Sequence, residues 1–177
     1  HAIELVHRMG LKAKLVISHA SGDEGYDYEN RVREYSALMG VDTRFVSNII
    51  NHTLGTTADG RKIYTLYDIY PHADLVTYPS TFEGFGNAFL EAVYFSKPIL
   101  INRYSIFVRD IEPKGFDLLT MDGYLDRKTV EKVREVLHSP RRRKDMVATN
   151  YAIAGKYYSY ATLRRWMNSI LINVFGL

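Results

Sequence analysis

Two glutamates, Glu83 and Glu91, flank a segment whose residue types suit the binding of a charged sugar derivative. Gly84 and Gly86 follow the first glutamate and allow a ligand to approach the backbone closely. The apolar residues after Asn87 predict a helix, and the start of a helix presents free N–H groups and a partial positive charge to a diphosphate. Carboxylates on either side of that anion can accept hydrogen bonds from sugar hydroxyls. The segment therefore predicts a site for a sugar linked to a diphosphate.

A simpler interpretation of the same residues stays open on spacing alone. Glu91, expected in or near the first turn, would only complement the helix dipole, and Glu83 would be solvated. In both interpretations Asn87 is expected to be the N-cap of the helix.

Short apolar strands alternate with helices along the chain. This alternation predicts an α/β fold with a parallel, Rossmann-like sheet and helices on both faces. Ligands of such sheets bind at the carboxyl ends of the strands. Strands are expected at 13–18, 43–48, 75–78, 98–101 and 115–119, a surface loop at 51–60, and helices at 2–9, 28–39, 63–70, 87–95, 127–138, 141–156 and 160–174.

Composition narrows the function classes. The 177 residues suit one domain, and the net charge of +3 is too small to predict nucleic-acid binding. The absence of cysteine excludes disulfides and thiolate metal sites. No apolar run is long enough to span a bilayer and no signal peptide is visible, so we expect a cytoplasmic protein, at most peripheral on a membrane. The histidines have no spacing typical of metal ligands.

The beginning of the chain is unusual. His1 is followed directly by a helical pattern with Ile3, Val6 and Met9 on one face, without an initiator methionine or a capping residue. We therefore expect a fragment that lacks residues on its N-terminal side.

Several short motifs together are more specific than the glutamates alone. They are Tyr64-Thr65-Leu66-Tyr67, Ala73-Asp74-Leu75-Val76, Pro79-Ser80, Glu83-Gly84-Phe85-Gly86, Leu90-Glu91-Ala92 and Lys97-Pro98-Ile99. With them the chain resembles the family 4 retaining glycosyltransferases, which have the GT-B fold of two Rossmann-like lobes with the donor between them. The resemblance implies that residues 1–177 form the C-terminal, donor-binding lobe, truncated on its N-terminal side. It also implies that the terminal helix, 157–177, contacts the missing N-terminal lobe.

The resemblance also implies roles for individual residues. Glu83 matches the catalytic-site glutamate that contacts the transferred sugar, and Glu91 the glutamate that binds the ribose hydroxyls. Ile49 lies where backbone groups hold the nucleotide base. His19, at a strand end, is a candidate ligand contact, with loop packing as the alternative. The remaining substrate-binding candidates are Gly84, Phe85, Gly86, Asn87 and Leu90.

Some positions depart from the family pattern. Ser96 replaces the usual glycine before Lys97, and residues 102–114 lack the expected glycine-rich turn but contain Arg103 and Tyr104. The phosphate-binding Arg and Lys of the family lie upstream of the first helix and are expected in the missing part. Residues 60–62 contain similar letters but lie in a later loop, so they are not assigned that role.

The expected function is transfer of a sugar from a nucleoside diphosphate to an acceptor hydroxyl with retention of configuration. The resemblance implies front-face attack with the leaving diphosphate as base, and it implies neither a metal nor another cofactor. The nucleotide base, the sugar and the acceptor stay open. The fragment alone is expected to be inactive and to bind a nucleoside diphosphate weakly.

Three alternatives remain. A phosphorylase with a covalent lysine cofactor would need Lys97 or Lys114, and a sugar-nucleotide epimerase shares the fold. A flavodoxin-like binding module would have no catalysis. Two further segments have structural as well as functional interpretations. The basic run at 140–144 is expected as a solvated helix start rather than a weak contact to anionic lipid, and the apolar stripe of the last helix as packing that is partly exposed without the other lobe.

Overall fold

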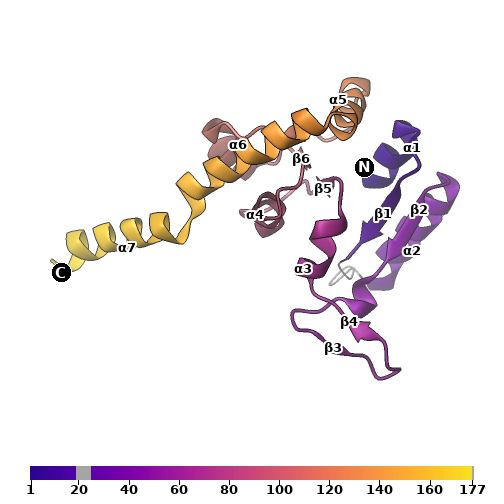
Figure 1. Ribbon diagram of the computed structural model, residues 1–177, viewed down its shortest axis with the longest axis horizontal. Coiled ribbons are helices and arrows are strands. Elements are labelled where there is room, and N and C mark those ends of the chain that lie inside the picture. Colours follow the sequence, from indigo (N-terminus) through magenta and orange to yellow (C-terminus); the bar gives the residue numbers. More distant parts are fainter. Residues whose placement is uncertain (19–24, 177) are drawn as a thin grey trace.

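The computed structural model describes residues 1–18 and 25–176. Strands and helices alternate as far as β7, after which the chain is helical (Figure 1). The strands are β1 Lys14–Ile17, β2 Asp42–Phe45, β3 Gly55–Thr56, β4 Lys62–Ile63, β5 Val76–Tyr78, β6 Ile99–Asn102 and β7 Leu119–Met121. The α-helices are α1 Ala2–Met9, α2 Gly25–Leu38, α3 Leu66–Ile69, α4 Asn87–Tyr94, α5 Arg127–His138, α6 Pro140–Tyr158 and α7 Tyr160–Phe175. Short 3-10 or π turns are η2 Ser47–Ile49, η3 Tyr70–His72, η4 Phe107–Ile111 and η5 Glu112–Lys114.

The parallel strands form two ladders. β5, β6 and β7 are hydrogen-bonded in that order, with Val76 opposite Ile99. β1 pairs with β2, with Lys14 opposite Asp42, and within the described residues no strand pairing joins this pair to β5. Leu5 of α1 packs in one core cluster with residues of β6 and β7, so α1 connects the two parts. The predicted α/β class with parallel strands is confirmed, with an interruption in its ladder.

Helices cover both faces of the three-stranded ladder. All residues of β6 are buried, and successive side chains point to opposite faces. Leu100 packs in the cluster that includes residues of α1 and α5, whereas Ile99 and Ile101 pack with residues of α4 and η4. Burial of each such side chain stabilises the fold by about 1.5–3 kcal/mol. β6 is therefore a rigid support for the loops at its carboxyl end.

The second expected strand is shorter than predicted. It was expected at 43–48 but ends at Phe45, opposite Ile17 at the end of β1, and the last bond between the two segments is donated by the Val46 N–H to the Ile17 carbonyl at 2.9 Å. The chain then enters the turn η2. The surface loop expected at 51–60 contains β3, which pairs antiparallel with β4.

The short helix expected at 63–70 begins only at Leu66. A capping box sets this start: the Thr65 N–H donates to Asp68 Oδ2 at 2.8 Å, and the Thr65 side chain caps the helix in return. Ile63 belongs to β4 instead.

The strand expected at 115–119 starts later, at Leu119. Gly115 has a φ of 83° and ends the turn η5. Asp117 is bonded to α6 rather than to a strand, because its N–H donates to Asn150 Oδ1 and its carbonyl accepts from Asn150 Nδ2, both at 2.7 Å. The backbone of Asp117 therefore bonds α6 and is not available for a strand ladder.

The expected terminal helix, 157–177, contains a break. α6 runs to Tyr158, and Ser159 caps the start of α7. α7 extends away from the rest of the molecule (Figure 1), and its Trp166 is 68% exposed. Contact of this helix with a second lobe stays a prediction. In the described part of the chain, no helix combines the length and apolarity needed to cross a membrane.

The basic residues at the start of α6 are partly used inside the fold. The Arg142 guanidinium donates to both carboxylate oxygens of Asp117. Arg143 donates to the carbonyl of Leu137 at 2.8 Å. These two arginines stabilise the packing of α6, which weakens the lipid-contact alternative for 140–144.

Candidate functional site

Gly86 is the N-cap of α4 and ends the glycine loop, defined as residues 79–86. Its φ is 89°, and a Cβ at this position would lie 2.8 Å from the Tyr104 hydroxyl oxygen and 3.0 Å from that of Tyr78. Backbone conformation and lack of space therefore both require glycine. The prediction that Asn87 caps this helix is wrong, because Asn87 is its first residue and the described cap has no side-chain hydrogen bond.

Glu83 lies half-buried in the glycine loop, close to two tyrosine hydroxyls. Burial, then a hydrogen bond to Glu83 and the charge of its carboxylate, raise the pKa of Tyr78 above its ordinary value. Burial and the charge of Glu83 also raise the pKa of Tyr104 to about 12. Both hydroxyls therefore stay protonated at neutral pH and are available as donors.

Phe85 is held at its carbonyl and at its ring. The Tyr104 hydroxyl donates to the Phe85 carbonyl oxygen at 2.8 Å. The Phe85 ring packs edge-on against Tyr158 at the end of α6, with 5.1 Å between ring centroids. Residues distant in sequence thus fix the central residue of the predicted sugar-binding segment.

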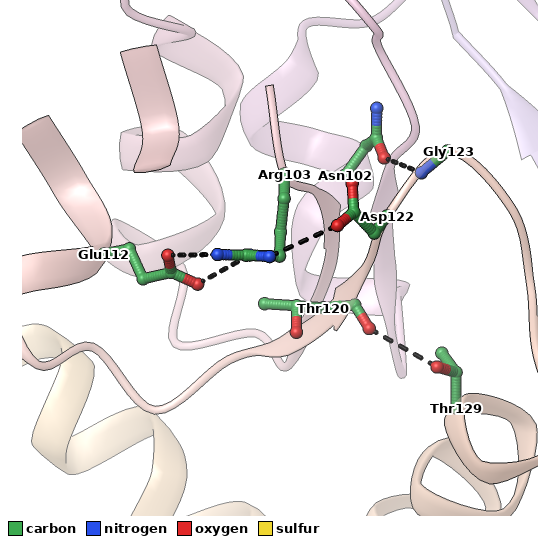
Figure 2. A network of polar contacts seen from close by, with 7 residues as sticks. All are labelled: Asn102, Arg103, Glu112, Thr120, Asp122, Gly123 and Thr129. Atoms are coloured by element: carbon green, nitrogen blue, oxygen red, sulfur yellow. Dashed lines mark hydrogen bonds and ion pairs between the residues drawn. The ribbon is translucent and has the colours of Figure 1, made fainter. Parts of the chain in front are cut away.

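Asn102, at the end of β6, ties the glycine loop to the loop after β7. Its side chain is buried, with Nδ2 donating to the Ser80 carbonyl at 3.0 Å and Oδ1 accepting from the Gly123 N–H at 2.8 Å. Figure 2 shows the second of these bonds. One side chain thereby fixes the spacing between two loops at the carboxyl end of the sheet.

The neighbouring Arg103 is engaged by acidic residues. Its guanidinium makes two bonds of 2.9 Å to the carboxylate of Glu112 and one of 3.3 Å to Asp122 (Figure 2). This network joins the loop after β6 to η5 and to the loop after β7. We therefore assign Arg103 a supporting role in the loop rather than ligand binding.

Glu91 lies in the second turn of α4, one turn beyond the helix start. Its Oε2 accepts a hydrogen bond of 3.0 Å from the hydroxyl of Tyr70. The Tyr70 ring stacks on Phe95 at 4.8 Å, and burial followed by the charge of Glu91 raises the pKa of Tyr70. Glu91 therefore has a fixed, neutral donor beside it. Leu90, the preceding residue, is half-buried against the core cluster that contains Ile99 and Ile101 of β6.

A cavity of about 360 Å³ lies near the carboxyl ends of β1 and β2. Ile49 is part of its wall, and its contact with a nucleotide base stays a prediction. The turn η3 connects this cavity to Glu91, because His72 lines the cavity and Tyr70 bonds Glu91. The other lining residues are Val16, Val46, Ile50, Tyr64, Asp68 and Ile69.

The backbone of Ile49 is already in use. Its N–H donates to Val46 at 3.0 Å and its carbonyl accepts from the Tyr64 N–H at 2.8 Å. A ligand can meet Ile49 through its side chain or through the second lone pair of its carbonyl. His19 lies outside the described residues.

The lysines considered for a covalent cofactor are engaged elsewhere. Lys97 Nζ donates to the Pro71 carbonyl at 2.8 Å, and Lys114 Nζ donates to the Asp110 carbonyl. Both contacts disfavour the phosphorylase alternative. Within the described residues, no group of three His, Asp or Glu side chains is arranged to hold a metal ion. The metal-independent reaction stays a prediction.

Sequence reasoning missed the partners of the two glutamates. Tyr70, Tyr78, Tyr104 and Asn102 were not among the predicted site residues, although Tyr78 and Asn102 stand at the carboxyl ends of strands. That position is the available sequence signal for both residues. Tyr70 and Tyr104 reach the site only through the tertiary fold.

Comparison with known sequences identifies related proteins. The family model described as Glycosyl transferases group 1 matches residues 48–152, more than half of the chain. The mannosylglucosylglycerate synthase of Petrotoga mobilis is 36% identical over 101 residues, which cover 55% of this chain and 22% of that protein. The enzyme of the same name from Thermotoga maritima is 29% identical over 154 residues, covering 79% of this chain and 34% of that protein. The matches thus span only a minor part of both relatives.

Among solved structures, HepE from Anabaena in complex with UDP-glucose has a similar fold. Its TM-score is 0.74 at 15% sequence identity, over 97% of this chain and 44% of that chain. At this identity the similarity concerns the fold alone. The expected GT-B fold class is thereby confirmed.

Proposed function

Because the chain belongs to the glycosyl transferases group 1 family, we propose that it forms the donor-binding lobe of a retaining glycosyltransferase. The enzyme would transfer a sugar from a nucleoside diphosphate to an acceptor hydroxyl. The observation that carries this proposal is the geometry around α4. Glu83 and Glu91 lie on either side of the helix start in the sequence, and each has a tyrosine hydroxyl beside it.

In this proposal the parts of a nucleotide sugar bind along the site in order. The cavity at Ile49 has a volume typical of small-ligand sites and suits the base. η3 leads from this cavity to Glu91, which is placed to accept hydrogen bonds from the ribose. The start of α4 offers its N–H groups and positive dipole end to the diphosphate. Glu83, beyond the diphosphate, is placed to accept hydrogen bonds from the transferred sugar.

In this arrangement catalysis depends on positioning and on charge stabilisation. The departing diphosphate accumulates negative charge, and the helix dipole of α4 stabilises it. Glu83 fixes the sugar so that the acceptor can attack from the face that the diphosphate leaves. The proton of the acceptor passes to the leaving diphosphate, so no protein nucleophile takes part.

The named relatives suggest which substrates to test first. HepE was solved with UDP-glucose, which favours a nucleoside-diphosphate hexose as donor. The two synthases are named for mannosylglucosylglycerate, so a glycoside of glycerate is the first acceptor to screen. Both assignments concern the whole protein rather than this lobe alone.

A donor screen with the full-length protein tests the proposal. We expect transfer from one of the UDP-, GDP- or ADP-hexoses and a loss of about a hundredfold or more in the Glu83→Ala variant, since a positioning contact is removed. The calorimetric Kd of the matching nucleoside diphosphate should change by less than about threefold. Full activity in Glu83→Ala would disprove the site. Absence of heat with UDP, GDP and ADP would favour the flavodoxin-like module instead.

A further inference from the structure

Tyr104 occupies the position where the resemblance predicts a glycine-rich turn. It is the second residue after β6, which ends at Asn102, and its side chain is only 2% exposed. Its ring packs against Phe107 at 5.9 Å and Tyr78 at 6.2 Å between centroids. A buried tyrosine in this loop therefore has its hydroxyl direction fixed by packing.

That hydroxyl reaches the glycine loop at one defined point. It donates to the Phe85 carbonyl at 2.8 Å, which orients the peptide unit between Phe85 and Gly86. This peptide unit carries the N–H of Gly86, the N-cap residue of α4. The same hydroxyl lies 2.8 Å from the place of a Cβ on Gly86. The orientation of the peptide before the helix thus depends on one phenol group.

A second hydroxyl lies beside the same glycine. The Tyr78 hydroxyl is 3.0 Å from the place of a Cβ on Gly86, and the neighbouring Glu83 carboxylate contributes to its raised pKa. Two phenols from different segments therefore meet at Gly86: that of Tyr104 is bonded to the peptide before α4, and that of Tyr78 lies beside Glu83.

We propose that Tyr104 is a positioning residue for sugar transfer, whose hydroxyl holds the Phe85–Gly86 peptide so that Glu83 and the start of α4 face the donor together. This inference rests on the proposed function of Glu83. The raised pKa of Tyr104, about 12, keeps the hydroxyl a donor across the physiological range. Removing the Tyr104 hydroxyl frees the Phe85–Gly86 peptide but leaves the cavity at Ile49 unchanged.

The test is Tyr104→Phe in the full-length protein, with donor kinetics and nucleotide binding measured together. We expect kcat to fall about tenfold, as for loss of one positioning hydrogen bond. The Kd of the nucleoside diphosphate should stay within about twofold, because the base and ribose contacts are distant from this hydroxyl and the N–H groups within α4 keep their helical positions. This split between kcat and Kd is the diagnostic result, since a general loss of structure would change both.

Tyr151→Phe is the control. It removes the hydroxyl of a tyrosine in α6 that is 53% exposed and contributes to none of the site contacts within the described residues. We expect its kcat to match that of the wild type. An unchanged kcat in Tyr104→Phe, or an equal loss in both variants, would overturn the positioning role. So would a weaker nucleotide Kd accompanied by a lower melting temperature. Lack of transfer by the wild-type protein with every donor would instead refute the proposed function itself.

Discussion

Both glutamates of the candidate site have tyrosine hydroxyls beside them, but Glu91 lies in a helix and Glu83 in a loop. Glu91 stands in the second turn of a regular helix, and Tyr70 adds one bond to a side chain whose backbone is already fixed. Glu83 stands in a loop whose conformation depends on hydroxyls contributed by β5 and by the segment after β6. The position of Glu91, at the proposed nucleotide end, is therefore set by local structure, and that of Glu83, at the proposed sugar end, by tertiary contacts.

This comparison predicts that the sugar end is the more sensitive of the two. The largest effect is expected for Gly86→Ala, because the new Cβ meets a positive φ and two hydroxyls at 2.8 and 3.0 Å. We expect a stability loss of about 1–3 kcal/mol. Transfer should fall by about a hundredfold, since the helix start and the loop must shift. Thermal unfolding and donor kinetics measure the two effects.

Gly155→Ala is the control for this substitution. Gly155 lies in α6, where an added Cβ meets no atom within 4 Å. We expect this variant to gain up to about 1 kcal/mol, because alanine is the better helix former. Equal losses of activity in the Gly86 and Gly155 variants would show that the sugar end has no special sensitivity.

A smaller effect is expected at the nucleotide end with Tyr70→Phe. The ring keeps its stacking on Phe95, and only the bond to Glu91 is lost. Loss of this bond should raise the Kd of the nucleoside diphosphate. The rise should be limited to about fivefold to tenfold, because the helix still holds the backbone of Glu91. Turnover at saturating donor should change by less than about twofold, since positioning at the sugar end is intact. A loss in kcat larger than that of Tyr104→Phe would reverse the comparison.

The smallest effect is expected in the cavity, with Ile49→Val. One methylene is removed from the wall, and the two backbone bonds of this residue are retained. The nucleotide Kd should rise by up to about fourfold, the value of one buried methylene. Ile63→Val in β4 removes the same group outside the cavity and should leave Kd unchanged. An equal rise in both variants would mean that Ile49 does not contact the base.

The sequence predicts the C-terminal half of the fold more closely than the loops. α5 was expected at 127–138 and has those bounds, because its apolar period and its Asp126 cap are local signals. β7 was expected too early because Phe116 and Leu118 are apolar, whereas the backbone of Asp117 between them bonds the side chain of Asn150 in α6. A local sequence pattern cannot predict a hydrogen-bond partner that is 33 residues away, as Asn150 is from Asp117.

The candidate site shows the same division. Glu83, Gly86 and Glu91 are visible in the sequence through their spacing and types. The tyrosines beside them are not, because a tyrosine in an apolar segment has the same local pattern whether its hydroxyl bonds a carboxylate or water. The cap was assigned to Asn87 rather than Gly86 because propensity favours asparagine, while the hydroxyls around position 86 exclude any side chain.

The space at Gly86 also has a consequence for how such a protein can evolve. The volume that a side chain would need is occupied by the hydroxyls of Tyr78 and Tyr104. Loss of both hydroxyls would remove the two shortest contacts of an alanine at position 86, while the Tyr78 ring carbon at 3.1 Å and the positive φ would still oppose it. A lineage with those two changes has also lost the hydroxyl beside Glu83 and the bond to the Phe85 carbonyl. The three positions are therefore epistatic. Descendants that keep either phenol are expected to keep the glycine, and the order of substitutions is constrained by the geometry of a single missing methyl group.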